Sequence, residues 1–195
     1  THLDLGFTAG TRSVCSQYFN IIFPEALNLS KTLRARGGEV QFRFTQFPWL
    51  IQEFLDGHAN CAWGGNGTRT NRSATDIAAM EQAIADGDVL WQATAVNFLP
   101  EILDEAMWDA SFEMAATLNR RFNKSWGRTV GKHSDVPGMS RSAIPALLSR
   151  GLKAYHIGYN PACTKQLKTL PEVFRWRMNE TGDEIIMMLN NFYGT

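Results

Sequence analysis

The feature that most constrains the fold is an alternation of short strand-like segments with longer helix-like segments. Apolar residues that alternate or cluster between turn residues predict strands at 39–45, 89–96, 129–134 and 153–158. Helical spacing of apolar residues predicts helices within 13–36, 48–56, 73–87, 100–122 and 139–151. Strands joined by helices of this length form right-handed crossovers. We therefore expect an α/β fold with mostly parallel strands.

Three local signals refine this prediction. Pro24 interrupts the first helical pattern, which indicates one kinked helix or two short ones. Ser73 and Asp76 have the spacing of a capping box, after a polar loop at 57–71. Near the end, strand patterns at 173–178 and 184–189 flank a short turn and predict a C-terminal hairpin.

The bulk composition favours one globular domain over residues 1–195. A 195-residue chain with 44% hydrophobic residues can bury a sizeable core. Lys+Arg and Asp+Glu both number 19, so we expect neither nucleic acid nor an anionic membrane as a partner. The apolar stretches are also shorter than the roughly 18 residues that suggest a membrane span. Because both ends of the sequence look cut, we expect a fragment of a larger domain.

Cysteines and glycosylation motifs bear on the cellular compartment. Cys15, Cys61 and Cys163 are too few and scattered for a metal motif or a disulfide framework, although one pair can form. Asn-x-Ser/Thr motifs occur at Asn28, Asn66, Asn71, Asn123 and Asn179, where chance would give about one or two. This excess predicts a secreted or secretory-pathway glycoprotein whose signal peptide is not in this sequence.

Asp135 is the first candidate site residue. It directly follows the predicted strand 129–134, and Val136-Pro137-Gly138 comes next, which can continue neither a strand nor a helix. We therefore predict that Asp135 lies at the carboxyl end of a strand. In parallel α/β folds, binding and catalytic sites gather at this edge of the sheet.

His2 and Asp4 are candidate metal ligands. Two residues apart, their side chains share one face if the segment is extended. Imidazole and carboxylate groups suit zinc, but so short a motif, taken by itself, is more typical of a surface histidine beside a helix-capping aspartate. Together with Asp135 they would form a three-ligand site with an open position, as in catalytic zinc sites.

Two segments resemble a known family. "THLDLGFT" resembles the opening His-x-Asp-x-Gly-aromatic motif of glycoside hydrolase family 38, the class II α-mannosidases, and "HSDVPGMSRSAIPALLSRGLKAYHIG" resembles its aspartate-centred segment. "VQFRFTQFPWLIQEFLD" and "LWQATAVNFLPEILDEA" follow the same order as the second and third strand regions of that family. The resemblance covers about residues 1–160. Including "FRWR", the chain is most similar to an uncharacterised domain family of fungi and bacteria related to these mannosidases.

The resemblance implies an incomplete (β/α)7-type barrel and a zinc-dependent retaining glycoside hydrolase acting on carbohydrate. By this likeness, His2, Asp4 and Asp135 bind zinc, Asp135 is also the nucleophile, and Phe7 packs against the sugar. Such an enzyme needs a second acid about 5 Å from the nucleophile. In the family, the general acid and a further histidine ligand fall later than Thr195.

The chain also departs from the family. Val136-Pro137-Gly138-Met139 replaces the usual Pro-aromatic-Gly-His after the nucleophile, and Phe7 replaces a tryptophan, so we expect a different substrate. Trp49 and Trp91, near predicted strand ends, are further candidates for sugar contacts. Glu101, Asp104 and Glu105 are available carboxylates, but their position favours a role at the start of a helix.

Two other classes of function remain open. A metal-dependent carbohydrate deacetylase would use metal-bound water in place of the Asp135 carboxylate as the attacking group. A non-catalytic carbohydrate-binding or degenerate domain would keep the rim of the fold without the chemistry. The sequence specifies neither the sugar, nor its linkage, nor self-association.

Overall fold

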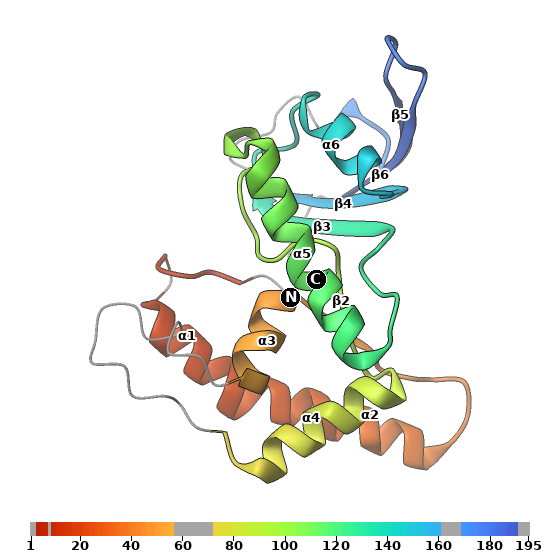
Figure 1. Ribbon diagram of the computed structural model, residues 1–195. Helices are drawn as coiled ribbons and strands as arrows, with labels where there is room; N and C mark the ends of the chain where they lie inside the picture. The colour runs from red at the N-terminus through yellow and green to blue at the C-terminus, as the bar shows by residue number, and fades with distance from the viewer. Residues whose placement is uncertain (1–2, 8, 57–71, 161–168, 191–195) are drawn as a thin grey trace. The chain divides into compact units, whose positions relative to one another are not determined.

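A computed structural model describes residues 3–7, 9–56, 72–160 and 169–190. Contacts within the chain define two compact units, Leu3–Trp91 and Gln92–Thr195, and each is described by itself. Both units combine helices with a sheet rich in parallel strands, so the predicted α/β class is confirmed (Figure 1). Within the described ranges, neither sheet closes into a barrel.

The Leu3–Trp91 unit begins with a continuous helical run. It comprises α1 (Thr11–Gln17), a π turn η1 (Tyr18–Ile22) and α2 (Phe23–Arg36). The π turn ends at Ile22, two residues before Pro24, which has no N–H to donate to the preceding turn. The predicted interruption is therefore a change of helix type. Gly37, with φ 69°, ends α2.

Two further helices of this unit are α3 (Pro48–Asp56) and α4 (Ala74–Asp86). The capping box before α4 is confirmed, because Ser73 Oγ accepts a hydrogen bond from Asp76 N at 3.1 Å and Asp76 Oδ2 accepts one from Ser73 N at 3.3 Å. The polar loop predicted at 57–71 lies outside the described residues. Cys15 is disulfide-bonded, and Cys61 and Cys163 also lie outside the described residues.

The core of this unit is aromatic. Strands β1 (Phe44–Gln46) and β2 (Val89–Trp91) pair in parallel, with Phe44 opposite Val89. The rings of Phe19, Phe23, Phe44 and Phe54 contact one another at centroid distances of 5.2 to 6.0 Å. Both strands are shorter than the predicted 39–45 and 89–96.

The Gln92–Thr195 unit contains a four-stranded sheet. Its strands are β3 (Val130–Val136), β4 (Ala154–Tyr159), β5 (Val173–Arg177) and β6 (Glu184–Asn190), in the order β3-β4-β6-β5. The first three strands in this order are parallel, and β5 pairs antiparallel with β6. The predicted C-terminal hairpin is confirmed, and its second strand lies beside β4.

Helices cover one face of this sheet. They are α5 (Glu105–Phe122), preceded by a 3-10 turn η3 (Pro100–Ile102), and α6 (Ala143–Ser149). The shared core is formed by buried side chains of β4 and β6 together with side chains of α5 and α6: Tyr155, Ile157, Tyr159, Ile185, Met187, Leu189, Trp108, Ile144 and Leu147. Among the helices that the structure describes, none has the length and apolarity needed to cross a bilayer.

Candidate functional site at the carboxyl end of β3

Asp135 is the extra residue of a β-bulge. Between β3 and β4, Ser134 pairs with Gly158 and Val136 pairs with the next residue, Tyr159, so Asp135 has no place in the register. Its φ of 60° lies in the left-handed region, which aspartate tolerates better than most residues with a Cβ atom. Bulges redirect a side chain and recur beside active sites. Asp135 therefore lies near the carboxyl end of a strand, as predicted, but the prediction that the strand ends before Val136 is wrong, since β3 includes Val136.

Asn160 holds the bulge from the neighbouring strand. It directly follows β4, and its backbone N–H donates to the carbonyl oxygen of Val136 at 3.0 Å. Its Nδ2 donates to Oδ1 of Asp135 at 2.7 Å. The half-buried carboxylate is therefore oriented by a neutral donor, the kind of support that ligating and nucleophilic carboxylates receive in known sites.

On the other side of β3, side-chain amides take the place of a regular strand. Gln92 Oε1 accepts from the backbone N–H of Lys132 at 2.9 Å, and Asn97 Oδ1 accepts from that of Ser134 at 2.8 Å. Asn97 Nδ2 also donates to the carbonyl oxygen of Ser134. β2 ends at Trp91, short of the predicted 96, and beyond it these side chains and the backbone N–H of Ala93, which donates to the carbonyl oxygen of Val130 at 3.1 Å, bond the backbone of β3.

His133 is a packed core residue next to this site. It is fully buried, its Nδ1 lies 3.0 Å from the hydroxyl of Tyr155, and the ring of Phe98 contacts its edge at a centroid distance of 4.4 Å. Burial lowers the pKa of His133 to about 3. The imidazole is therefore neutral at physiological pH and supports the sheet beneath the bulge.

The other predicted site residues belong to the first unit or precede it. His2 lies outside the described residues, and Asp4 lies in the Leu3–Trp91 unit, so the predicted zinc triad with Asp135 stays a prediction. Phe7 is 89% exposed, which suits a stacking platform. Trp49 is half-buried on α3. Trp91 is 2% exposed, which is typical of a core residue and unlike an open sugar platform.

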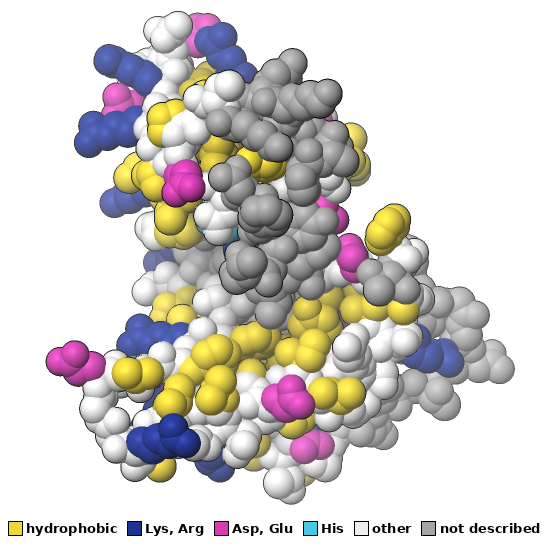
Figure 2. Space-filling view, turned by 180° about the vertical axis from the view of Figure 1, so that it is seen from behind, with side chains coloured by type: hydrophobic (Ala, Val, Ile, Leu, Met, Phe, Trp, Pro, Cys, Tyr) yellow, Lys and Arg dark blue, Asp and Glu magenta, His cyan; other side chains and the backbone are white. Residues whose placement is uncertain are grey.

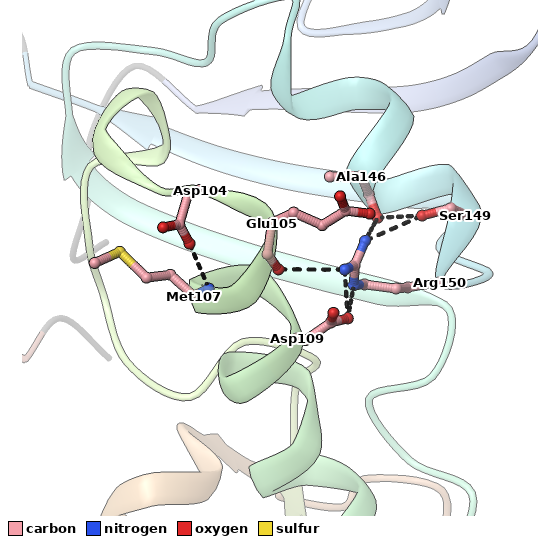
Figure 3. Close-up of polar contacts among 7 residues, drawn as sticks. All are labelled: Asp104, Glu105, Met107, Asp109, Ala146, Ser149 and Arg150. Carbon is pink, nitrogen blue, oxygen red and sulfur yellow. Dashed lines mark hydrogen bonds and ion pairs between the residues drawn. The ribbon is translucent and has the colours of Figure 1, made fainter.

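Of the three carboxylates predicted near the start of α5, Asp104 has the helix-capping role that its position favours. Asp104 is the N-cap residue of α5, and its Oδ1 accepts from the backbone N–H of Met107 at 2.8 Å (Figure 3). Arg150, directly after α6, forms an ion pair with Asp109 and donates to the carbonyl oxygens of Ala146 and Glu105. This arginine joins α6 to the first turns of α5.

A metal site made only of described residues is absent: no group of three or more His, Cys, Asp or Glu side chains there can hold an ion. The sequence interpretation also missed Asn97 and Asn160. Asn97 directly follows the strand predicted at 89–96, so the rule that selected Asp135 would have selected it; Asn160 follows β4 only in the structure, because the predicted strand ended at 158.

Comparison with known proteins adds no relative. No protein-family model matches the chain, and no curated protein matches it significantly. The resemblance to the class II α-mannosidases therefore rests on the quoted motifs.

Proposed function

We propose that this chain carries the nucleophile of a zinc-dependent retaining glycoside hydrolase similar to the class II α-mannosidases, and that its sheets belong to an incomplete (β/α)7-type barrel. The observation that carries the proposal is Asp135, held on a left-handed bulge at the carboxyl end of a parallel strand. A backbone conformation that costs about 1–2 kcal/mol persists only where the surroundings enforce it, and such positions cluster at active sites.

In the proposed reaction, a carboxylate oxygen of Asp135 attacks the anomeric carbon while the bond to the leaving oxygen breaks. A second carboxyl group gives its proton to that oxygen, and water later hydrolyses the glycosyl ester with retention of configuration. The amide of Asn160 donates to one oxygen of the Asp135 carboxylate and would help to hold that carboxylate in place for the attack.

The residues that would hold zinc are His2, Asp4 and Asp135. One imidazole and two carboxylates are a chemically suitable donor set, and the Asn160 hydrogen bond is the support that a ligating carboxylate usually has. A zinc ion bound there would bind adjacent sugar hydroxyls and favour distortion of the ring. Phe7, with its exposed ring, would contact the apolar face of the sugar.

The direct test is labelling with a 2-deoxy-2-fluoro-mannosyl fluoride, followed by peptide mapping of the full-length protein. We expect a covalent adduct on Asp135, and no adduct in Asp135→Asn. Asp183→Asn, a change of an exposed carboxylate in the β5–β6 turn, is the matched control and should label normally.

Two results would overturn the proposal in different directions. Metal-dependent release of acetate from an acetylated sugar, without any adduct, would identify the deacetylase alternative. Saturable carbohydrate binding without turnover of glycoside or ester would identify a non-catalytic carbohydrate-binding domain.

A further inference from the structure

Three of the Asn-x-Ser/Thr motifs lie wholly within the described residues, and the structure holds them in different backbone conformations. They begin at Asn28, Asn123 and Asn179. The motif is read as a unit in which the hydroxyl group two residues on assists the asparagine amide, so the two side chains must be able to meet. Side chains two residues apart share a face in extended backbone but do not face each other on a helix. The local backbone therefore decides which motifs can be modified.

The motif at Asn28 is held in an unreactive form. Asn28 and Ser30 both lie within α2, and Ser30 is only 3% exposed. The hydroxyl of Ser30 lies 3.0 Å from the carbonyl oxygen of Ala26 and 3.2 Å from that of Phe42, and it donates to the backbone. This hydroxyl is therefore turned away from the amide of Asn28 and buried in its unit.

The motif at Asn123 is open. Asn123 ends α5 with φ 50° and ψ 49°, is exposed, and is followed by two residues without regular structure. Among the residues that the structure describes, none forms a hydrogen bond with the side chain of Asn123 or Ser125. Both residues line a broad hollow of about 1350 Å³, which leaves room for a sugar ring beside them.

The motif at Asn179 is open as well. It occupies the turn between β5 and β6, where Asn179 and Thr181 are both exposed. The turn projects beyond the rest of its unit (Figure 1), and Figure 2 shows charged and other polar side chains at this end of the unit. The hydroxyl oxygen of Thr181 accepts a hydrogen bond from the backbone N–H of Asp183 at 3.3 Å, so its own O–H remains available as a donor.

The disulfide of Cys15 is an independent observation that bears on this modification. Cys15 is buried and disulfide-bonded. Disulfides form and persist in the secretory pathway and outside the cell, and they are rare in the cytosol. The disulfide therefore favours a compartment in which N-glycans are attached.

We infer that Asn123 and Asn179 carry N-linked glycans and that Asn28 does not. In the modification, Nδ2 of the asparagine forms a bond to the anomeric carbon of an oligosaccharide that is carried on a polyprenyl diphosphate. The bond from that carbon to the diphosphate oxygen breaks, and the polyprenyl diphosphate leaves with the electron pair. Nδ2 gives up one proton to a base of the transferring enzyme. The inference does not rest on the glycosidase proposal.

The test is mass spectrometry of the full-length protein, purified from the cells that make it and treated with peptide N-glycosidase in 18O-labelled water. The enzyme converts each glycan-bearing asparagine into an 18O-labelled aspartate and leaves an unmodified asparagine unchanged. We expect the label at Asn123 and Asn179 and none at Asn28. Incubation in the same water without the enzyme is the control for spontaneous deamidation.

Matched variants made in the same cells assign the label to each motif. Ser125→Ala and Thr181→Ala keep the asparagine but remove the hydroxyl, so each should lose the label at its own motif and retain it at the other. Ser125→Thr keeps a hydroxyl and should keep the label at Asn123. All three variants change exposed side chains, so we expect each of them to fold.

An absence of label at Asn123 and Asn179 would overturn the inference. A label at Asn28 as strong as that at Asn123 would overturn the selection by backbone conformation. A label that survives in Ser125→Ala and Thr181→Ala would do the same by showing that the motifs do not direct it. None of these results changes the expected labelling of Asp135 by the fluorinated mannoside, so a failure of this inference is distinguishable from a failure of the proposed function.

Discussion

The backbone of Asp135 explains why an aspartate occupies this position. At φ 60°, most side chains crowd the following carbonyl, whereas Asp and Asn tolerate the left-handed region. Asp135→Asn keeps an oxygen that can accept from Asn160 Nδ2, so we expect a change of less than about 1 kcal/mol in the free energy of unfolding. Asp135→Ala loses both the tolerance of the left-handed region and the oxygen that accepts from Asn160 Nδ2. We therefore expect its free energy of unfolding, measured by urea denaturation, to fall by about 1–3 kcal/mol.

Asp135→Gly is the control for the cost of the left-handed backbone conformation at this position, because glycine adopts positive φ without strain. It should be more stable than Asp135→Ala although it removes one more carbon atom. An alanine variant as stable as the glycine variant would contradict the left-handed bulge. Turnover should be lost in all three variants if Asp135 is the nucleophile, so stability and activity report separately on the residue.

His156 predicts a pH dependence of stability. Burial lowers its pKa, the nearby charge of Lys132 lowers it further, and a hydrogen bond with Asn190 opposes both. Its buried Nδ1 has no hydrogen-bond partner among the described residues, so protonation would add an uncompensated proton there. Because the folded pKa is depressed, His156 favours the folded state above the ordinary value of 6.5, and this contribution is lost as the pH falls below 6.5.

We therefore expect the unfolding free energy of the wild type to fall faster than that of His156→Gln between pH 6.5 and 4.5. Partial exposure of the imidazole keeps the difference in slope below the limit of about 1.4 kcal/mol per pH unit. Urea denaturation at several pH values measures it. Parallel curves for the two proteins would show that the histidine titrates normally in the folded chain.

At the scale of elements, Asn97 replaces a strand by a single side chain. Its amide bonds both the N–H and the carbonyl group of Ser134 at the edge of β3. Asn97→Ala would leave both groups to find water, at a cost of about 1–3 kcal/mol in unfolding free energy. We expect faster hydrogen exchange of the Ser134 amide, next to the bulge, and little change at Tyr155 in the adjacent strand.

Asn97→Asp is the informative companion, because a carboxylate can accept from Ser134 N but cannot donate to its carbonyl oxygen. Its stability should lie between those of the wild type and Asn97→Ala. An alanine variant with unchanged exchange at Ser134 would show that the amide does not hold this edge.

The same elements show how far the sequence predicts the fold. The residues 48–56 and 73–87 carry their own start and stop signals, so α3 and α4 were predicted almost to the residue. The strand predicted at 89–96 was too long, because its apolar pattern cannot reveal that Gln92 and Asn97 bond β3 through their side chains. Asp135 was placed at a strand end by Pro137 and Gly138, but its bulge depends on pairing with β4, which no local pattern encodes.

At the scale of the whole molecule, the sequence predicts parallel pairing better than strand order. The helical crossovers of the Gln92–Thr195 unit require that β3 and β4 run in parallel. The hairpin pattern predicts that β5 and β6 pair antiparallel, but not that β6 continues the parallel set beside β4. Closure of a sheet into a barrel is harder to predict from sequence than strand order, because it depends on the tilt and stagger of all the strands together.

The proposed zinc site tests the molecule as a whole, because its predicted ligands come from the beginning of the chain and from β3. We expect about one zinc ion per chain in metal analysis of the natively purified full-length protein. His2→Ala, Asp4→Ala and Asp135→Ala should each lower zinc affinity at least about tenfold, because each removes one of three protein ligands. Asp183→Asn, which changes a carboxylate in the β5–β6 turn, should retain it.

Zinc affinity should also fall as the pH drops below about 6.5, because protons compete for the imidazole of His2. Zinc that binds only the folded protein should raise its unfolding free energy by about 2.7 kcal/mol at a free concentration one hundred times the Kd. The Asp135→Ala variant should lose most of this gain, whereas a site formed by His2 and Asp4 alone would retain it. An undiminished gain would remove Asp135 from the ligand set and leave it the role of nucleophile alone.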